Sequence, residues 1–299
     1  DHGRDGVYLS QKNMGNGDFE LEVSGNVVNE ANFSTRGNLI VQILDQDNTT
    51  VLEKKLPLEL TAETPFHIKS KIRQPMLWEG IENPYLYTVH VSIHIDGRMY
   101  DERSIKYGFR TIEVTPDQGL RLNGKPLKLN GVSRHQDYAG VGNAITKAHM
   151  DEDMALIRDI GANSIRLSHY QHDDYFYSLC DQYGMLVWAE IPFISIPSTQ
   201  DPEHQNASAQ LERLIKQAYN HCSIYCWGVQ NEITIAVENE NTYDSVKRLE
   251  ALAKHLDPGR LTAQANIYSV EDDSPLNAFT DLVGYNLYYG WYYGAMKDL

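Results

Sequence analysis

Residues 227–235 read "WGVQNEITI", and this segment gives the clearest indication of the fold. It starts like a buried apolar strand and then reaches Asn231 and Glu232, two polar groups in an apolar run. In a βα-barrel the parallel strands are buried on both faces, and ligands meet them at their C-terminal ends. A buried strand that closes on two polar side chains therefore predicts a barrel strand with a site at its tip.

The segments around this stretch repeat the alternation of strand and helix from about residue 115 onward. Most of the six strand-like segments end in polar residues, namely Arg134 and His135, Ser168 and His169, Glu190, Asn231 and Glu232, and Asn286. Strands that alternate with helices pair in parallel through right-handed crossovers. Residues 115–299 are therefore predicted to form about six of the eight strands of a C-terminally truncated TIM (β/α)8 barrel. Gly161, Gly184 and Gly259 follow the helical patterns, where left-handed caps are expected.

Before residue 115 the hydrophobic period is two. The segments 18–25, 66–73 and 88–96 each alternate apolar and polar residues, which is typical of strands with one buried face. They predict an antiparallel β-sandwich, so the whole chain is expected to be a multi-domain β and α/β protein. His67, His90 and His94 fall on the polar faces, which argues against a metal role.

The composition narrows the classes of partner. Lys and Arg number 26 against 41 Asp and Glu, and the resulting net charge of -15 would repel nucleic acids and anionic membranes. A neutral small molecule fits better. The chain has no apolar run of about 18 residues and its first residues are polar, so we expect a soluble, cytoplasmic protein. Cys180, Cys222 and Cys226 are expected to be reduced core thiols.

The strand ends offer side chains suited to carbohydrate chemistry. A carboxyl group at the mouth of an apolar barrel is partly desolvated, which favours its protonated form. Glycoside hydrolysis needs such an acid for the leaving oxygen and a second carboxylate as nucleophile or base. Glu232 is the candidate acid, with Asn231, His135 and His169 as hydrogen-bonding partners of sugar hydroxyls. The alternative is that Glu232 caps the next segment or pairs with an arginine such as Arg166.

Further candidates lie nearby. Asn286 ends the sixth strand and is a candidate substrate ligand. The run "YNLYYGWYYG", residues 285–294, is rich in aromatic rings, and Trp291 or a neighbouring tyrosine could form a platform for a sugar ring. The alternative for these rings is packing between barrel and helices. Glu190, at the end of the adjacent strand, is the carboxylate that could rival Glu232.

Several motifs resemble the family 2 glycoside hydrolases, and most closely their bacterial β-galactosidases. The matching pieces are "RDGVYL", "WEGIENPYLYTV", "YGFRTIEV", "LNGKPLKLNGVSRHQD", "IRLSHYQHDDYFYSLCDQYGMLVWAEIPF" and "NHCSIYCWGVQNEITI". The resemblance implies a retaining glycosidase with an immunoglobulin-like sandwich over residues 15–114 and a catalytic barrel over 115–299. It also implies that residues 1–14 are the end of a jelly-roll domain or a linker.

The resemblance assigns roles to individual residues. Glu232 matches the general acid/base, Asn231 its sugar-binding neighbour, and His135 and His169 the histidines of the subsite for a galactosyl unit. A terminal β-D-galactoside is thus the expected substrate. The family's nucleophilic Glu lies on a seventh strand, expected beyond residue 299, so the chain alone is expected to be inactive.

Other expectations concern metals and partners. The segment "EIPFISIPS", residues 190–198, carries Ile194 and Ile196 where many relatives have metal ligands, so no metal and no cofactor are expected. The same fold and Asn-Glu pair also serve β-glucuronidases and β-mannosidases, and a catalytically inactive carbohydrate-binding fragment is a further alternative. A homo-oligomer is compatible with the open edges of an incomplete barrel.

Overall fold

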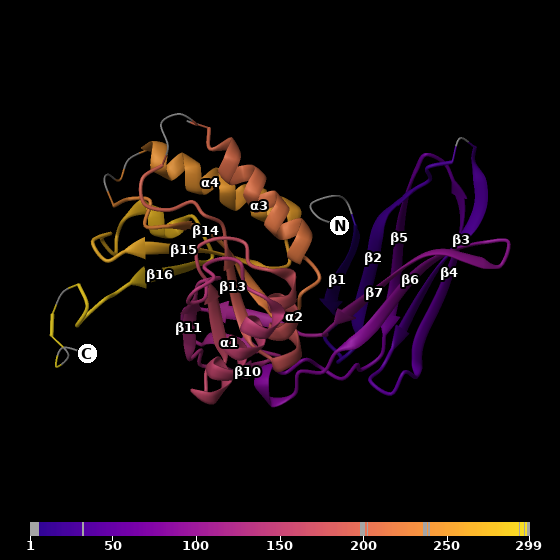
Figure 1. Cartoon of the computed structure of the whole chain (residues 1–299), viewed down its shortest axis with the longest axis horizontal. Helices are drawn as coiled ribbons and strands as arrows, with labels where there is room; N and C mark the ends of the chain where they lie inside the picture. The colour runs from indigo at the N-terminus through magenta and orange to yellow at the C-terminus, as the bar shows by residue number, and fades with distance from the viewer. Residues whose placement is uncertain are drawn as a thin grey trace.

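The computed structural model describes residues 6–31, 33–197, 201, 203–235, 238, 240–292, 294, 295 and 297. Over these residues the chain forms a β-sandwich that lies beside a curled parallel sheet with helices on its outer side (Figure 1). The sandwich and the half-barrel expected from the sequence are confirmed. Residues 1–5, assigned above with 6–14 to a preceding domain or linker, lie outside the described residues.

The sandwich consists of two antiparallel sheets. One has the order β1 (Val7–Asn13), β2 (Phe19–Val28) and β5 (Glu63–Ile72), and the other β4 (Thr50–Leu60), β3 (Thr35–Leu44), β6 (Tyr87–Ile95) and β7 (Arg98–Tyr107). Alternate residues of the inner strands are buried and form one core around Leu21, Ile43 and Val89. β1 pairs with β2 along its whole length, so the sheet already begins near residue 7.

Between sandwich and barrel the chain forms short elements. A small antiparallel sheet contains β8 (Ile112–Thr115), β9 (Gly119–Leu122) and β10 (Lys125–Pro126), whereas the 3-10 helix η1 (Gly80–Glu82) lies within the sandwich, between β5 and β6. Leu122 of this sheet packs with Trp78 and with Leu186 of the barrel. The small sheet therefore covers one end of the barrel core. The domain limits at residues 15 and 115 stay a proposal.

The second part is a parallel sheet of six strands within the described residues. Its strands follow the chain in the order β11 (Gly131–Arg134), β12 (Ser164–Leu167), β13 (Leu186–Glu190), β14 (Ile224–Asn231), β15 (Leu261–Ile267) and β16 (Leu282–Asn286). The connections contain α1 (Lys147–Asp159), α2 (Asp174–Tyr183), α3 (Gln205–Ala218), α4 (Glu240–Leu256) and the 3-10 helix η2 (Pro275–Ala278). α3 and α4 cover the outer face of the sheet (Figure 1). Every residue of β14 is buried, as the apolar run predicted.

Helix ends follow local capping chemistry. Gly161 and Gly184 have φ of 77° and 76°, the left-handed caps expected from the sequence. The expectation for Gly259 was wrong, because α4 already ends at Leu256 and the Gly259 N–H donates to the Asp257 carboxylate instead. α1 begins at Lys147, because Thr146 provides an N-terminal capping box.

The seam between the two parts is closely packed. Gly184 lies against the backbone of Gly80, and a Cβ built on Gly184 would meet the Gly80 carbonyl at 2.2 Å. The Trp78 indole N–H donates to the carbonyl oxygen of Asp181 over 2.8 Å. The guanidinium of Arg110 donates to the carbonyl oxygens of Cys222 and Ile224 at the start of β14. The sandwich thus contacts the end of the barrel opposite to the tip of β14.

A buried histidine joins α2 to the start of β14 at this seam. The side chain of His221 is 13% exposed, and its Nδ1 lies 2.6 Å from the Asp181 carboxylate while its Nε2 lies 3.3 Å from that of Asp174. Burial by itself lowers the pKa of His221, but the charges and hydrogen bonds of the two carboxylates outweigh it and raise the pKa to about 9. His221 is therefore a doubly donating cation at neutral pH.

This ion cluster predicts a pH-dependent stability. A raised folded-state pKa stabilises the fold fully below the ordinary histidine value near 6.5, and this contribution is lost as the pH rises through about 9. We expect wild type to exceed His221→Asn by up to about 3 kcal/mol in free energy of unfolding at pH 6, and the gap to shrink by pH 10. Urea unfolding of both proteins across this range measures it. A gap independent of pH would contradict the protonation of His221.

Within the described residues, every helix is too short or too polar to cross a membrane. Cys180, Cys222 and Cys226 are buried and not paired in disulfides, as expected.

Candidate active site

The polar strand ends converge at the C-terminal edge of the parallel sheet. Glu190 is the last residue of β13, Asn231 is the last of β14, and Asn286 is the last of β16. Glu232 follows β14 directly, and its N–H donates to the carbonyl oxygen of Ala265 on β15 over 2.8 Å. Parallel strands bring their carboxyl ends to one edge, so the ends of three strands that are distant in sequence contribute side chains to one site.

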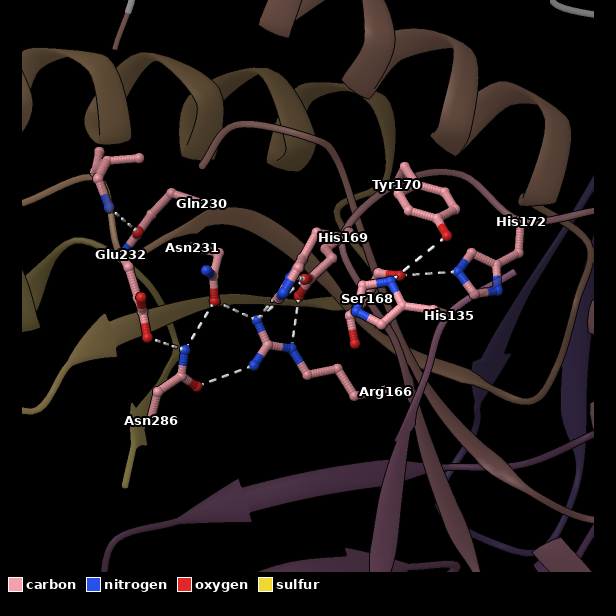
Figure 2. A network of polar contacts seen from close by, with 12 residues as sticks. His135, Arg166, Ser168, His169, Tyr170, His172, Gln230, Asn231, Glu232 and Asn286 are labelled. Atoms are coloured by element: carbon pink, nitrogen blue, oxygen red, sulfur yellow. Dashed lines mark hydrogen bonds and ion pairs between the residues drawn. The ribbon is translucent and has the colours of Figure 1, made fainter. Parts of the chain in front are cut away.

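Arg166 of β12 is the centre of the polar network shown in Figure 2. Its Nε and Nη2 donate to the two carboxylate oxygens of Glu190 over 2.9 and 3.0 Å. Nη2 also donates to Asn231 Oδ1 over 2.7 Å, and Nη1 donates to Asn286 Oδ1 over 3.0 Å. A planar guanidinium with five donors suits such bidentate binding. Arg166 thereby fixes the ends of three other strands relative to one another.

Glu232 is held by Asn286 rather than by an arginine. Asn286 Nδ2 donates to Glu232 Oε1 over 2.7 Å and to Asn231 Oδ1 over 2.9 Å. Arg166 forms its ion pair with Glu190. The alternative in which Arg166 pairs with Glu232 is therefore wrong. The Glu232 side chain is half-buried. It remains accessible to a ligand while one of its oxygens is fixed.

The backbone of Glu232 is left-handed, with φ of 53°. For a residue with a Cβ this conformation costs roughly 1 to 2 kcal/mol, and it persists only where the surroundings determine it. The neighbouring backbone is tied on both sides. The Asn231 N–H donates to Phe193, and the Asn231 carbonyl accepts from Ser195, over 2.9 and 3.0 Å. The strained turn swings the carboxyl group out of the strand and toward Asn286.

His169 and His135 lie next to each other at the neighbouring strand ends. His169 Nδ1 bonds to the Glu190 carboxylate, which orients the ring and leaves Nε2 as the nitrogen available to a ligand. His135 is exposed. The centres of the His135 and His169 rings are 5.5 Å apart, and the angle between the ring planes is 73°. The hydroxyl of Tyr170 is 3.5 Å from His135 Nδ1. His169 thus belongs to the cluster that contains Glu232, through Glu190 and Arg166, and His135 lies beside it through its contact with the His169 ring.

Below the site, Trp188 fills the interior of the half-barrel. A Cβ on Gly228 would lie 2.4 Å from the Trp188 indole nitrogen and 2.5 Å from the Glu190 Cβ, and one on Gly284 would lie 3.4 Å from the ring. The strand glycine is therefore required for close approach at position 228. The Arg166 guanidinium lies 5.3 Å from the centre of the Trp188 ring. This packing supports the Arg166–Glu190 pair from beneath.

The structure does not bring Trp291 into this cluster. Trp291 is 80% exposed, and its ring contacts that of Tyr292 at 6.3 Å. Tyr288 and Tyr289 are 40% and 45% exposed and lie in the same segment after β16. Ile194 and Ile196 are exposed on the loop after β13. Among the described residues, no group of three or more His, Cys, Asp or Glu side chains is placed to hold a metal ion.

The central role of Arg166 in the polar network was not predicted from the sequence. Arg166 was considered as a partner of Glu232, whereas it organises Glu190, Asn231 and Asn286. A signal was present, because an arginine inside the apolar strand "SIRL" must be paired when the strand is buried. Its partner could not be chosen without knowing which side chains point into the barrel.

The sandwich, the half-barrel and the polar rim define the class: proteins in which a βα-barrel presents ligand-binding side chains at the C-terminal strand ends. The family follows from comparison with known proteins. "Glycosyl hydrolases family 2" matches residues 7–110, and "Glycosyl hydrolases family 2, TIM barrel domain" matches residues 112–298. The chain belongs to glycosyl hydrolase family 2.

Similar proteins carry two names. A β-glucuronidase from Bacteroides fragilis is 38% identical over 309 aligned residues, covering 100% of this chain and 43% of the relative. A β-galactosidase from Thermoanaerobacterium thermosulfurigenes is 33% identical over 229 residues, covering 74% of this chain and 30% of the relative. The crystal structure of a β-glucuronidase from Bacteroides uniformis has a TM-score of 0.94 and 33% identity over 100% of this chain and 38% of that one. The chain thus spans less than half the length of these relatives.

Proposed function

We propose that the full-length protein is a retaining exo-β-glycosidase and that Glu232 is its general acid/base. The observation that carries this proposal is the convergence of Glu232, Asn231 and Asn286 at one strand edge, with Asn286 bonded to both neighbours. Glu232 would protonate the leaving oxygen and then deprotonate the attacking water. Asn231, Asn286, His135 and His169 would bind sugar hydroxyls.

We propose that the nucleophile is contributed by a carboxylate outside these 299 residues. Retention needs two carboxyl groups roughly 5 to 5.5 Å apart. Glu190 is the other carboxylate in the cluster, but it is fully buried and both of its oxygens are bound by Arg166. A carboxylate held in this way is a poor nucleophile, since attack would require it to leave its cation and enter the cleft. Glu190 is better suited to fixing Arg166 and His169.

For the substrate, we propose a β-glucuronide first and a β-galactoside second. The names of the relatives from Bacteroides fragilis and Bacteroides uniformis, which match the whole chain, support the glucuronide. The galactoside expected from the sequence is supported by the β-galactosidase match over 74% of the chain. Arg166 is occupied by Glu190, so a cation for the glucuronate carboxylate would come from another residue.

The test is a comparison of kcat/KM on 4-nitrophenyl β-D-glucuronide and 4-nitrophenyl β-D-galactoside with the full-length protein. We expect a preference of about 10²-fold or more for the glucuronide, because a site with a cation for the carboxylate leaves that cation unpaired with a neutral sugar. A higher kcat/KM on the galactoside would contradict the glucuronide proposal and favour a β-galactoside as the substrate. Turnover of neither substrate, with sugar binding retained, would favour a carbohydrate-binding protein.

A further inference from the structure

A chain of buried side-chain amides lies behind Glu232, on the side of the helices. Gln230 is 1% exposed and its Nε2 donates to Asn266 Oδ1 on β15 over 2.8 Å. Asn266 is fully buried and its Nδ2 donates to Asn277 Oδ1 over 2.8 Å. Asn277 Nδ2 donates in turn to the carbonyl oxygens of residues 271 and 272. The amide chain thus runs from the tip of β14 to the loop before η2.

The inner end of this chain holds the backbone next to Glu232. Gln230 Oε1 accepts the N–H of Ile233 over 3.3 Å, so one side chain bridges the residues on either side of the pair Asn231 and Glu232. Figure 2 shows Gln230 on the side of the helices, while the Glu232 carboxyl group points to Asn286. Ile233 is buried, so its N–H has no access to water if Gln230 withdraws.

This contact constrains the backbone conformation of Glu232. Its φ of 53° requires that the peptide groups before and after it keep fixed orientations. The peptide group before Glu232 is fixed because the Glu232 N–H donates to the carbonyl oxygen of Ala265. The peptide group after it is held because the Ile233 N–H donates to Gln230 Oε1. The carbonyl oxygen of the same Glu232–Ile233 peptide group accepts the Ile235 N–H over 3.1 Å, within the short turn that follows β14. Without the Gln230 bond this peptide group loses its tether to the body of the barrel and can shift together with the turn, and the carboxyl group would then move away from Asn286.

We propose that Gln230 is a positioning residue for the general acid, which it holds in the left-handed conformation through the N–H of Ile233. The proposal rests on the proposed function of Glu232. It predicts that loss of the Gln230 amide impairs proton donation specifically, in addition to any loss of stability. Sugar binding, which uses side chains on the opposite side of the strand, should change little.

The chain offers a matched control. Gln264 of β15 is the register partner of Gln230 and is fully buried, and its Nε2 donates to the carbonyl oxygen of Leu276 over 2.7 Å. Its amide is therefore tied to η2 and not to the segment after β14. Gln230→Met and Gln264→Met each replace a buried amide by an apolar chain of similar length. Both should lower the melting temperature.

The experiment measures kcat/KM of the full-length protein on phenyl and 2,4-dinitrophenyl glycosides of its preferred sugar. The phenolate is a poor leaving group that needs the acid, whereas dinitrophenolate needs it little. For Gln230→Met we expect the phenyl to dinitrophenyl ratio of kcat/KM to fall by about tenfold, since a group misplaced by about 1 Å can lose up to ~10²-fold in rate. Gln264→Met should keep the wild-type ratio. KM for the phenyl glycoside should change less than kcat.

Glu232→Gln, measured beside them, separates two kinds of failure. If Glu232→Gln lowers the ratio strongly but Gln230→Met behaves like Gln264→Met, the positioning role is wrong while Glu232 stands as the acid. If Glu232→Gln leaves the ratio unchanged, Glu232 is not the acid, and both proposals are wrong. Should Gln230→Met not fold, Asn277→Ala removes the half-buried outer anchor of the same chain. It should lower the ratio in the same direction, and an unchanged ratio would overturn the positioning role.

Discussion

Glu232→Gln is expected to lower the turnover of unactivated β-glycosides by about 10² to 10⁴-fold in the full-length protein, because it removes the proton donor for the leaving oxygen. The glutamine oxygen can still accept from Asn286, whose Nδ2 lies 2.7 Å from Glu232 Oε1, so the side chain should keep its place. The loss therefore reports the missing proton rather than a distorted site. Steady-state kinetics on a phenyl glycoside measure it.

A dinitrophenyl glycoside provides the internal comparison for this variant. Its leaving group departs without a proton, so the glycosylation step should suffer far less from Glu232→Gln. Glu113→Gln is a matched control, since Glu113 is an exposed carboxylate of β8 and lies outside the cluster. It should retain wild-type kinetics. Equal losses of kcat/KM on both glycosides would show that Glu232 does not donate the proton.

Arg166→Met is expected to destabilise the barrel by about 3 to 5 kcal/mol, because it leaves a fully buried carboxylate without its cation. The Arg166 side chain is 18% exposed and that of Glu190 is 0% exposed, so water cannot replace the lost donors at Glu190. Asn231 and Asn286 lose a donor in the same change. Urea unfolding monitored by tryptophan fluorescence measures the change in free energy.

The double variant Arg166→Met with Glu190→Leu is the control for this effect. Apolar replacement of both members of a buried pair removes the uncompensated charge, so the double variant should recover a large part of the stability. If the double variant is as unstable as the single variant, the uncompensated charge of Glu190 is not the cause of the lost stability. The loss would then come from the missing packing of Arg166 against Trp188.

Most of the fold could be predicted from hydrophobic periodicity. The alternating segments became β2, β5 and β6, and the six apolar segments became β11 to β16 in chain order. Parallel topology then placed Glu190, Asn231, Glu232 and Asn286 at one edge without further information. These predictions depend on burial and on the handedness of connections, which sequence patterns express directly.

The pairing within the site could not be predicted in the same way. It depends on which side chains face the barrel interior, and β-bulges shift the register between Val187 and Trp188 and between Gly228 and Gln230. The left-handed conformation of Glu232 also has no signal in the residue type, since glutamate rarely adopts it. Trp291 was chosen for its chemistry, but its position depends on the course of the chain after β16. Arg166 became the centre of the network for the same geometric reason.

The contact between Gly80 and Gly184 has a consequence for how such a chain can evolve. Backbone meets backbone there, and a Cβ on Gly184 would lie 2.2 Å from the Gly80 carbonyl, so the barrel cannot acquire a side chain at position 184 without parting from the sandwich. Gly108 adds a second such point, where a Cβ would lie 2.8 Å from Cys222. A recombination event that joined this barrel to the sandwich of another family member would therefore yield a well-seated hybrid only if the incoming sandwich kept bare backbone at position 108 and a backbone course at position 80 that fits against Gly184. At these two contacts, substitutions in one domain are thus limited by the surface of the other.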